Sequence, residues 1–261
     1  SPDDIFSLKE RPYKESAMLV AESFLTGELD SAVIRQVVDD AYNFAVPLEK
    51  VTRGRYVMRL DQGPTASFKD FAARMMARLM SRFRDAGKRL NVLVATSGDT
   101  GSAVGEAFRG VEGIGVTILY PRGEVSGRQK KQLDTIGGNV QAVSVEGKFD
   151  DCQNLVKQAF ADAGLAGLNL TSANSINFGR IMPQIIYYVY ACAQLASSCE
   201  SIVFSVPSGN FGDALGCEYA RRMGLPVQML VMPTNENDEF PRYLETGIYK
   251  KVTPSRACLS N

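Results

Sequence analysis

Two kinds of hydrophobic pattern follow one another along the 261-residue chain. Between residues 15 and 45, apolar side chains recur at helical spacing, as at Leu19 and Val20, and few glycines interrupt them. Residues 55–60 alternate between apolar and polar side chains, as a half-buried strand does. The pattern therefore predicts a helical N-terminal segment, 1–55, that leads into strand-containing sequence.

From residue 90 onward, short apolar runs alternate with amphipathic stretches. The run at 91–96 is apolar at nearly every position, which is typical of a parallel strand buried on both faces. The other strands that we expect are 115–121, 139–145, 201–206 and 226–232. The helices that we expect are 101–110, 126–138, 149–164, 176–195 and 211–224. This alternation with short links indicates an α/β fold with a mostly parallel sheet.

The pattern becomes irregular after Met232. We expect no regular element between that residue and the last residue, Asn261. A fold of this kind normally ends on a strand or helix, so we expect the chain to be truncated at its C-terminus.

Charge and cysteine content narrow the class of protein. Twenty-nine basic and twenty-nine acidic residues cancel, so no net charge favours binding to nucleic acid or to an anionic membrane. The longest apolar run, 185–195, is too short to span a bilayer. The five cysteines are scattered and form no C-x-x-C pair, which is typical of reduced cysteines. We expect a cytoplasmic protein without a membrane or nucleic-acid partner.

The chain contains no histidine. This absence excludes Ser-His and Cys-His nucleophile pairs, histidine zinc sites and acid–base catalysis by histidine. We expect no metal site. An enzyme with this sequence would move protons on lysine, carboxylates, tyrosine, water or a cofactor.

A glycine-rich loop, S-V-P-S-G-N-F-G-D at 205–213, joins an expected strand to an expected helix. Small residues allow successive backbone N–H groups to point into one concavity, and a helix N-terminus adds positive potential. The loop therefore suits a phosphate group. The alternative is a tight turn that needs glycine only for its backbone conformation.

A second strand-to-helix loop, T-S-G-D-T-G at 96–101, combines hydroxyl groups, backbone amides and one carboxylate. It suits the carboxylate of a small substrate, bound by Thr96, Ser97, Thr100 and backbone donors. The alternative is that Asp99 or Thr100 caps the following helix.

The stretch G-P-T-A-S-F-K-D places Lys69 where a helix is expected to begin. Ser67 and Asp70 resemble a weak capping box. A cation in the first helical turn is disfavoured by the helix dipole, so a structural role suits this lysine poorly. Burial near Phe68 and Phe71 would lower its pKa and favour the neutral amine that attacks an aldehyde. The alternative is a solvent-facing lysine.

A reactive amine, a phosphate loop and a carboxylate-binding turn, without histidine or metal ligands, suit pyridoxal 5'-phosphate acting on an amino acid. The cofactor supplies an electron sink, and the protein supplies the lysine, the phosphate site and orientation.

Several long stretches closely resemble the threonine synthase family of the bacterial and fungal type. They are G-P-T-A-S-F-K-D-F, A-T-S-G-D-T-G-S-A-V, L-Y-P-R-G-E-V-S-G-R-Q-K-K-Q-L, G-K-F-D-D-C-Q-N-L-V-K-Q-A-F, L-T-S-A-N-S-I-N and S-V-P-S-G-N-F-G-D. The resemblance runs from about residue 15 to the end of the chain. It implies the fold type II architecture of tryptophan synthase β: mostly parallel twisted sheets flanked by helices, in two α/β domains with the cofactor between them. We accordingly expect a helical segment (1–55), a smaller α/β domain with the cofactor lysine (56–200) and a partial large α/β domain with the phosphate loop (201–261).

The resemblance also implies residue roles. Lys69 matches the lysine that forms the Schiff base with the cofactor. The other residues implied in cofactor binding are Asp99, Gly209, Asn210, Phe211 and Gly212. The loop over the substrate carboxylate and the cofactor ring includes Ser97, Asp99 and Thr100. The implied phosphate pocket for the substrate, O-phospho-L-homoserine, contains Asn174, Ser175, Asn177 and Arg180. An alternative for this last group is that the asparagines cap a helix and Arg180 lies on its surface.

The implied reaction is a γ-elimination followed by a β-replacement. Phosphate leaves from Cγ, water adds at Cβ and threonine is released, with Lys69 as acid and base. The expected assembly is a monomer or homodimer. Three alternatives stay open: an O-phosphohomoserine phospho-lyase that releases 2-oxobutyrate, a serine or threonine dehydratase, and a truncated, non-catalytic module.

Overall fold

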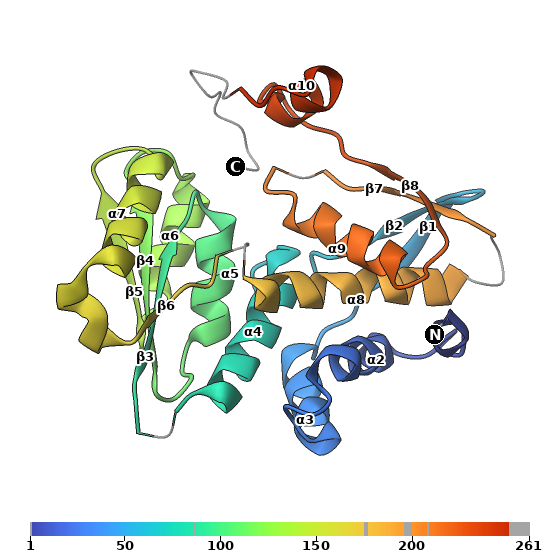
Figure 1. Ribbon diagram of the computed structural model, residues 1–261, viewed down its shortest axis with the longest axis horizontal. Coiled ribbons are helices and arrows are strands. Elements are labelled where there is room, and N and C mark those ends of the chain that lie inside the picture. Colours follow the sequence, from blue (N-terminus) through green and yellow to red (C-terminus); the bar gives the residue numbers. More distant parts are fainter. Residues whose placement is uncertain (1, 86, 175–176, 196–199, 208, 251–261) are drawn as a thin grey trace.

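The computed structural model describes residues 2–85, 87–174, 177–195, 200–207 and 209–250. Its helices and strands form two packed regions, and the long helix α8 (Phe178–Leu195) runs from their junction through one of them (Figure 1). Among the described residues, no helix is long and apolar enough to cross a membrane.

The N-terminal part contains three helices and a hairpin. The helices are α1 (Pro2–Phe6), α2 (Tyr13–Leu25) and α3 (Ser31–Ala41), and the antiparallel strands are β1 (Leu48–Thr52) and β2 (Arg55–Met58). The prediction of helices in this part is confirmed, but residues 48–52 form a strand within the segment expected to be helical. Four of the five residues of β1 are exposed, so this strand lacks the apolar alternation that reveals a strand in a sequence.

A four-stranded parallel sheet forms the first α/β region, with strand order β5-β4-β3-β6. Its strands are β3 (Leu90–Ala95), β4 (Ile114–Pro121), β5 (Val140–Val145) and β6 (Leu170–Thr171). Its helices are α5 (Asp99–Phe108), α6 (Gly127–Thr135) and α7 (Phe149–Ala161), followed by the 3-10 turn η1 (Ala163–Leu168). On β3, Val92 and Val94 pack with residues of α5, whereas Leu93 and Ala95 pack with residues of α7. Helices therefore cover both faces of the sheet, as the apolar run predicts.

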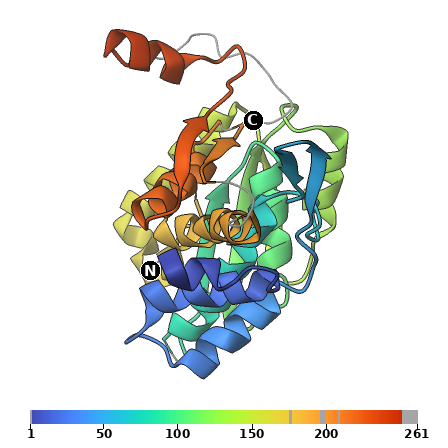
Figure 2. The same cartoon turned by 90° about the vertical axis from the view of Figure 1, so that its right-hand side faces the viewer.

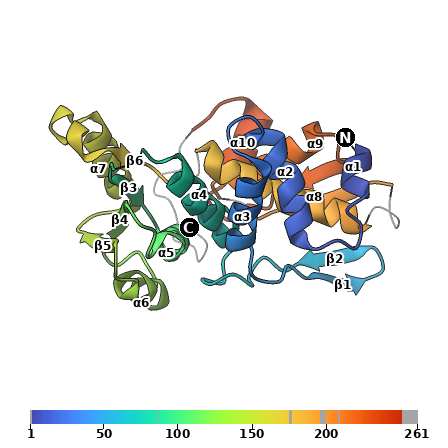
Figure 3. The same cartoon turned by 90° about the horizontal axis from the view of Figure 1, so that it is seen from below.

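The second region is built around α8. The parallel strands β7 (Ile202–Ser205) and β8 (Val227–Val231) pair beside α9 (Gly212–Arg222), and α10 (Glu239–Thr246) follows. Helices α2, α4 (Lys69–Phe83) and α9 surround α8 (Figures 2 and 3). Most residues of α8 are buried, because other helices pack against it on several sides.

Helix α4 contributes to both hydrophobic cores. Phe71 and Met75 belong to the core around α8, whereas Ala73, Met76 and Ala77 belong to the core of the four-stranded sheet. The same helix therefore joins the two regions.

Every strand and helix expected from residue 90 onward is present, with ends that differ by a few residues. The expectation of no regular element after Met232 is wrong, because α10 occupies part of that stretch. Its sequence does contain the usual boundary signals: Glu239 in the first turn, Pro241 close behind, and Gly247 in the left-handed conformation at the C-cap. The short strand β6 also lacks a clear signal, since only two of its residues pair.

Helices α8 and α9 approach closely at Gly216, where a Cβ atom would lie 3.0 Å from the carbonyl oxygen of Gln184. We expect Gly216→Val to lower the free energy of unfolding by about 2 kcal/mol, because the added methyl groups would push the two helix backbones apart. Urea unfolding measures the change. Gly127→Val is the matched control, since a Cβ at Gly127 meets no atom within 4 Å; equal effects of the two variants would contradict the prediction.

Candidate active site

Lys69 is the first residue of α4, and the preceding turn is fixed by Asp70. The Asp70 carboxylate accepts hydrogen bonds from the Thr65 backbone N–H (2.8 Å) and hydroxyl (2.7 Å). Ser67 accepts a hydrogen bond from the Lys69 N–H through its hydroxyl (3.3 Å). The expected capping box of Ser67 and Asp70 is only half formed: the Ser67 backbone N–H bonds to the Asp70 carboxylate, but the Ser67 hydroxyl accepts from Lys69 rather than from Asp70. Gly63 allows this arrangement, since a Cβ there would overlap the Asp70 side chain.

The side chain of Lys69 is largely buried, with 16% of its surface exposed. Its Nζ lies 3.8 Å from Oδ2 of Asp99 and 4.5 Å from the ring centroid of Phe68. Burial lowers the pKa of Lys69; Asp99 opposes that shift, and Arg180 adds to it. The solvent-facing alternative is therefore excluded. Phe71, in contrast, packs into the aromatic core of the α8 region.

The loop between β3 and α5 is shaped by Thr96, which is 1% exposed. Its hydroxyl accepts hydrogen bonds from the N–H groups of Gly98 (3.0 Å) and Gly101 (2.8 Å) and lies 3.2 Å from the Gly98 carbonyl. These contacts give Thr96 a role in shaping the turn. Ser97 and Thr100 lie half-buried on the same turn.

Asp99 opens α5, whose N-cap is Gly98 and has no side-chain cap bond. Neither Asp99 nor Thr100 therefore caps the helix, and that alternative is wrong. Oδ1 of Asp99 accepts a hydrogen bond from Nε2 of Gln129 (2.8 Å), while Oδ2 faces Lys69. No local sequence pattern marks Gln129, because its partner lies thirty residues away.

Arg180 is 3% exposed, on the first turn of α8. Its Nη1 donates to the Ala173 carbonyl (2.9 Å), but its buried Nε has no hydrogen-bond partner among the described residues. Burial lowers the pKa of Arg180 to about 10. The alternative that Arg180 lies on a helix surface is therefore wrong.

The asparagines before α8 shape its start. Asn177 accepts a hydrogen bond from the Gly179 N–H through Oδ1 (2.9 Å) and donates to the Ser172 carbonyl through Nδ2 (3.3 Å). The capping alternative therefore holds for Asn177. The carbonyl of the half-buried Asn174 accepts from the Asn177 N–H (3.1 Å), and Ser175 lies outside the described residues.

The glycine-rich loop ends at the N-terminus of α9. Gly209 and Asn210 are exposed, Phe211 is the N-cap in the left-handed conformation (φ 52°), and Gly212 opens the helix. The Phe211 ring packs against Phe240, with 4.4 Å between centroids. An exposed loop that leads into a helix N-terminus fits a phosphate group.

A buried carboxylate, Asp213, was missed by the sequence analysis. Its Oδ1 accepts hydrogen bonds from the hydroxyls of Tyr187 (2.6 Å) and Tyr188 (2.5 Å), both on α8. Burial raises the pKa of Asp213, while the two tyrosines and the charge of Lys69 act in the opposite direction. An acidic residue directly after the glycine loop was the available signal in the sequence.

Four charged side chains thus come together from four helices: Lys69 (α4), Asp99 (α5), Arg180 (α8) and Asp213 (α9). Figure 1 shows these helices meeting where the two regions join. Pyridoxal phosphate needs an amine for its aldehyde and a binding site for its phosphate. The buried Lys69 amine and the N-terminus of α9 fit these two needs. Within the described ranges, no group of three His, Cys, Asp or Glu side chains could hold a metal ion.

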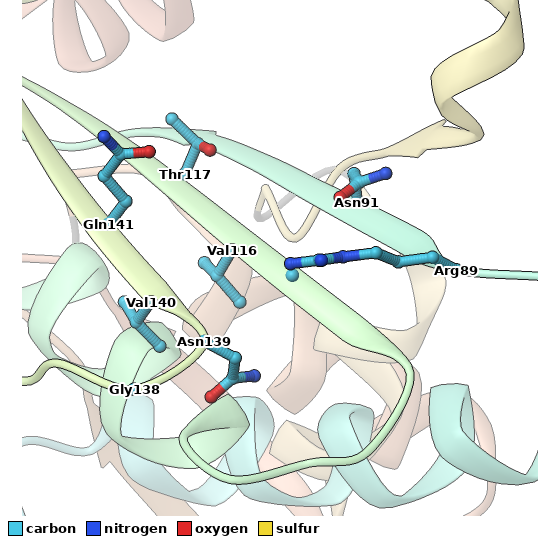
Figure 4. A pocket seen from close by; sticks show the side chains of 9 residues that line it. Arg89, Asn91, Val116, Thr117, Gly138, Asn139, Val140 and Gln141 are labelled. Atoms are coloured by element: carbon cyan, nitrogen blue, oxygen red, sulfur yellow. The ribbon is translucent and has the colours of Figure 1, made fainter.

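One hollow lies away from this group of residues. It has a volume of about 390 Å³ and is lined by residues near the amino ends of β3, β4 and β5, among them Arg89, Asn91, Thr117 and Gln141 (Figure 4). Ligands of parallel α/β sheets bind at the carboxyl ends of the strands, where Thr96 lies. The groups around Lys69 therefore define the candidate active site.

The chain belongs to the family of pyridoxal-phosphate dependent enzymes, whose pattern matches residues 45–260. Its fold is the type II fold of that class. Within the class, the chain is similar to threonine synthases. It is 44% identical to the threonine synthase of Haemophilus influenzae over 99% of its own length and 61% of that protein.

Solved structures give the same likeness. The structure of pyridoxal-phosphate-bound threonine synthase from Brucella melitensis matches with a TM-score of 0.88 at 41% identity, over 96% of this chain and 56% of that one. Yeast threonine synthase matches with a TM-score of 0.88 at 34% identity, over 100% of this chain and 55% of that one. The chain therefore spans little more than half the length of these relatives.

Without cofactor, the buried Lys69 should lower stability. The pKa of Lys69 is lower in the folded chain than its ordinary value of 10.5. Between these two pKa values the unfolded chain binds more protons than the folded chain. The free energy of unfolding therefore rises with pH over this range. We expect Lys69→Met to raise the free energy of unfolding at pH 7 by on the order of 1 kcal/mol, with a difference that shrinks as the pH approaches 10.5.

Urea unfolding of the cofactor-free chain at several pH values measures this difference. The control is Lys88→Met, because the Lys88 side chain is 69% exposed. A stability gain for Lys88→Met equal to that for Lys69→Met would contradict the prediction.

Proposed function

We propose that this chain acts as a threonine synthase, which converts O-phospho-L-homoserine and water to L-threonine and phosphate, with pyridoxal phosphate attached at Lys69. The likeness to threonine synthases supports the reaction. The observation that supports the attachment site is the buried Lys69 amine at the start of α4, whose pKa is lowered by that burial.

Lys69 would act as the acid and base of the reaction. When bound, the cofactor supplies the electron sink for carbanion chemistry. A lowered pKa increases the fraction of neutral amine, which is the form that accepts a proton from a substrate carbon. Asp99 then lies close enough to stabilise the protonated form, and no histidine is required.

The other residues would bind the phosphate groups and the carboxylate. The cofactor phosphate is assigned to Gly209, Asn210, Phe211 and Gly212, which lead into the N-terminus of α9. Thr96, Ser97 and Thr100 are assigned to the substrate carboxylate, and the Thr96 hydroxyl also shapes the turn that carries the other two. Asp99 would face the cofactor from its place beside Lys69.

The substrate phosphate is assigned to Asn174, Ser175, Asn177 and Arg180. Support comes from Arg180, whose buried Nε has no partner among the described residues. An unpaired buried guanidinium donor is costly, and a phosphate oxygen would satisfy it. The capping bonds of Asn177 would hold the same turn in place.

Three further expectations from the sequence stay predictions: the division at residues 55 and 200, the monomer or homodimer, and the cytoplasmic location.

The experiment that tests the proposal is turnover of O-phospho-L-homoserine, with L-threonine and 2-oxobutyrate both measured. We expect threonine and phosphate in equal amounts. Release of 2-oxobutyrate instead of threonine would identify a phospho-lyase, and the absence of both products would reject the proposed activity for this chain.

Lys69→Ala should abolish covalent attachment of the cofactor, because no amine remains at that position. After incubation with pyridoxal phosphate and reduction with borohydride, mass spectrometry should find the cofactor on Lys69 of the unchanged chain and not on the variant. Lys88→Ala, which removes an exposed lysine, should keep the adduct. An adduct retained by Lys69→Ala would reject Lys69 as the attachment site.

Arg180→Lys should lower kcat/KM for O-phospho-L-homoserine by about 100-fold, because lysine cannot make the forked contacts of a guanidinium with phosphate. Steady-state kinetics measure the change, and circular dichroism checks the fold. Arg109→Lys is the control, since Arg109 is paired with Glu106 at the surface. Equal kinetics for Arg180→Lys and the unchanged chain would place the substrate phosphate elsewhere.

A further inference from the structure

Gln129 links the start of α6 to the candidate active site. Its backbone N–H donates to the Ser126 hydroxyl (3.2 Å), and its Oε1 accepts from the Ser126 N–H (3.0 Å), so the two residues form a capping box. Its Nε2 donates to Oδ1 of Asp99 (2.8 Å). Both ends of the side-chain amide are therefore fixed by hydrogen bonds.

Gly98 leaves room for this amide. The residue has a φ of 146°, and a Cβ built on it would overlap the side-chain amide of Gln129. The side-chain amide of Gln129 therefore packs directly against the backbone of Gly98, in the turn that contains Asp99.

Gln129 and Lys69 contact different oxygens of the Asp99 carboxylate. Oδ1 is held by Gln129, and Oδ2 lies 3.8 Å from Nζ of Lys69. The Asp99 side chain is 39% exposed, so it has room to turn toward water when that bond is removed. We infer that Gln129 is a positioning residue that holds the Asp99 carboxylate toward Lys69 and so sets how readily the amine loses its proton.

The charges around Lys69 give the direction of the effect. Burial lowers its pKa, Asp99 from α5 and Asp213 from α9 act against that shift, and Arg180 from α8 adds to it. Gln129 is uncharged and bonds to Asp99. Loss of Gln129 should therefore weaken the contribution of Asp99 and lower the pKa of Lys69 further.

The test measures the reactivity of Lys69 in the cofactor-free chain. Trace acetylation with acetic anhydride over a range of pH, read by mass spectrometry, compares Lys69 with the exposed Lys88 in the same sample. We expect Gln129→Met to speed acetylation of Lys69 about threefold relative to Lys88 at pH 8. A change of this size corresponds to the interaction energy of a partly exposed ion pair. Asp99→Asn should have an effect at least as large.

Ser126→Ala is the matched control. It removes the Ser126 hydroxyl from the capping box but leaves the bond from Gln129 to Asp99, so the pH profile of Lys69 should not change. In the double variant Asp99→Asn with Gln129→Met, the profile should equal that of Asp99→Asn alone, because Gln129 acts through Asp99.

An unchanged Lys69 profile in a folded Gln129 variant, or an equal shift in Ser126→Ala, overturns the inference. If circular dichroism finds that Gln129→Met is unfolded, Gln129→Asn replaces it, since this shorter amide cannot span from Ser126 to Asp99, and the same outcomes apply. The inference rests on the proposed role of Lys69 as the reactive amine. Its test uses neither cofactor nor substrate, so its failure and a failure of threonine synthesis are separate results.

Discussion

Burial of one lysine amine is the constraint around which the site is arranged. A buried ammonium group is unfavourable unless opposite charge lies near, and Lys69 has Asp99 and Asp213 on two neighbouring helices, with Arg180 acting against them. The net result is a lowered pKa of Lys69. Each of these residues lies at or near the start of its helix. The relative positions of these four helix ends therefore set the charges that surround the Lys69 amine.

Helix α8 provides the scaffold for this arrangement. Its first turn carries Arg180, and Tyr187 and Tyr188 further along bind Asp213 of α9. The close contact at Gly216 keeps α9 against α8, and the glycine loop directly precedes α9. This mostly buried helix thus fixes the glycine-rich loop relative to Lys69, although α8 itself contains neither.

The sequence predicted the elements whose side chains alternate or recur clearly, and the positions of Lys69 and the two loops. It could not predict β1, where most side chains are exposed, or the paths of individual hydrogen bonds. Asp70 illustrates the limit, because no local pattern shows that its carboxylate also binds Thr65, five residues earlier. Gln129 was missed for a related reason: its partner Asp99 lies thirty residues away, so no local pattern marks it. Asp213 directly follows the glycine-rich loop, but its bonds to Tyr187 and Tyr188 depend on the packing of α9 against α8.

The position of α4 in both hydrophobic cores has a consequence for cooperativity. Phe71 and Met75 anchor it in one core, and Ala73 and Met76 anchor it in the other, so neither core can open while this helix stays fully packed. In hydrogen-exchange terms, the amides of α4 should exchange with the opening of whichever region is less stable. Lys69 lies at the start of this helix, so it would lose its buried environment together with the packing of α4.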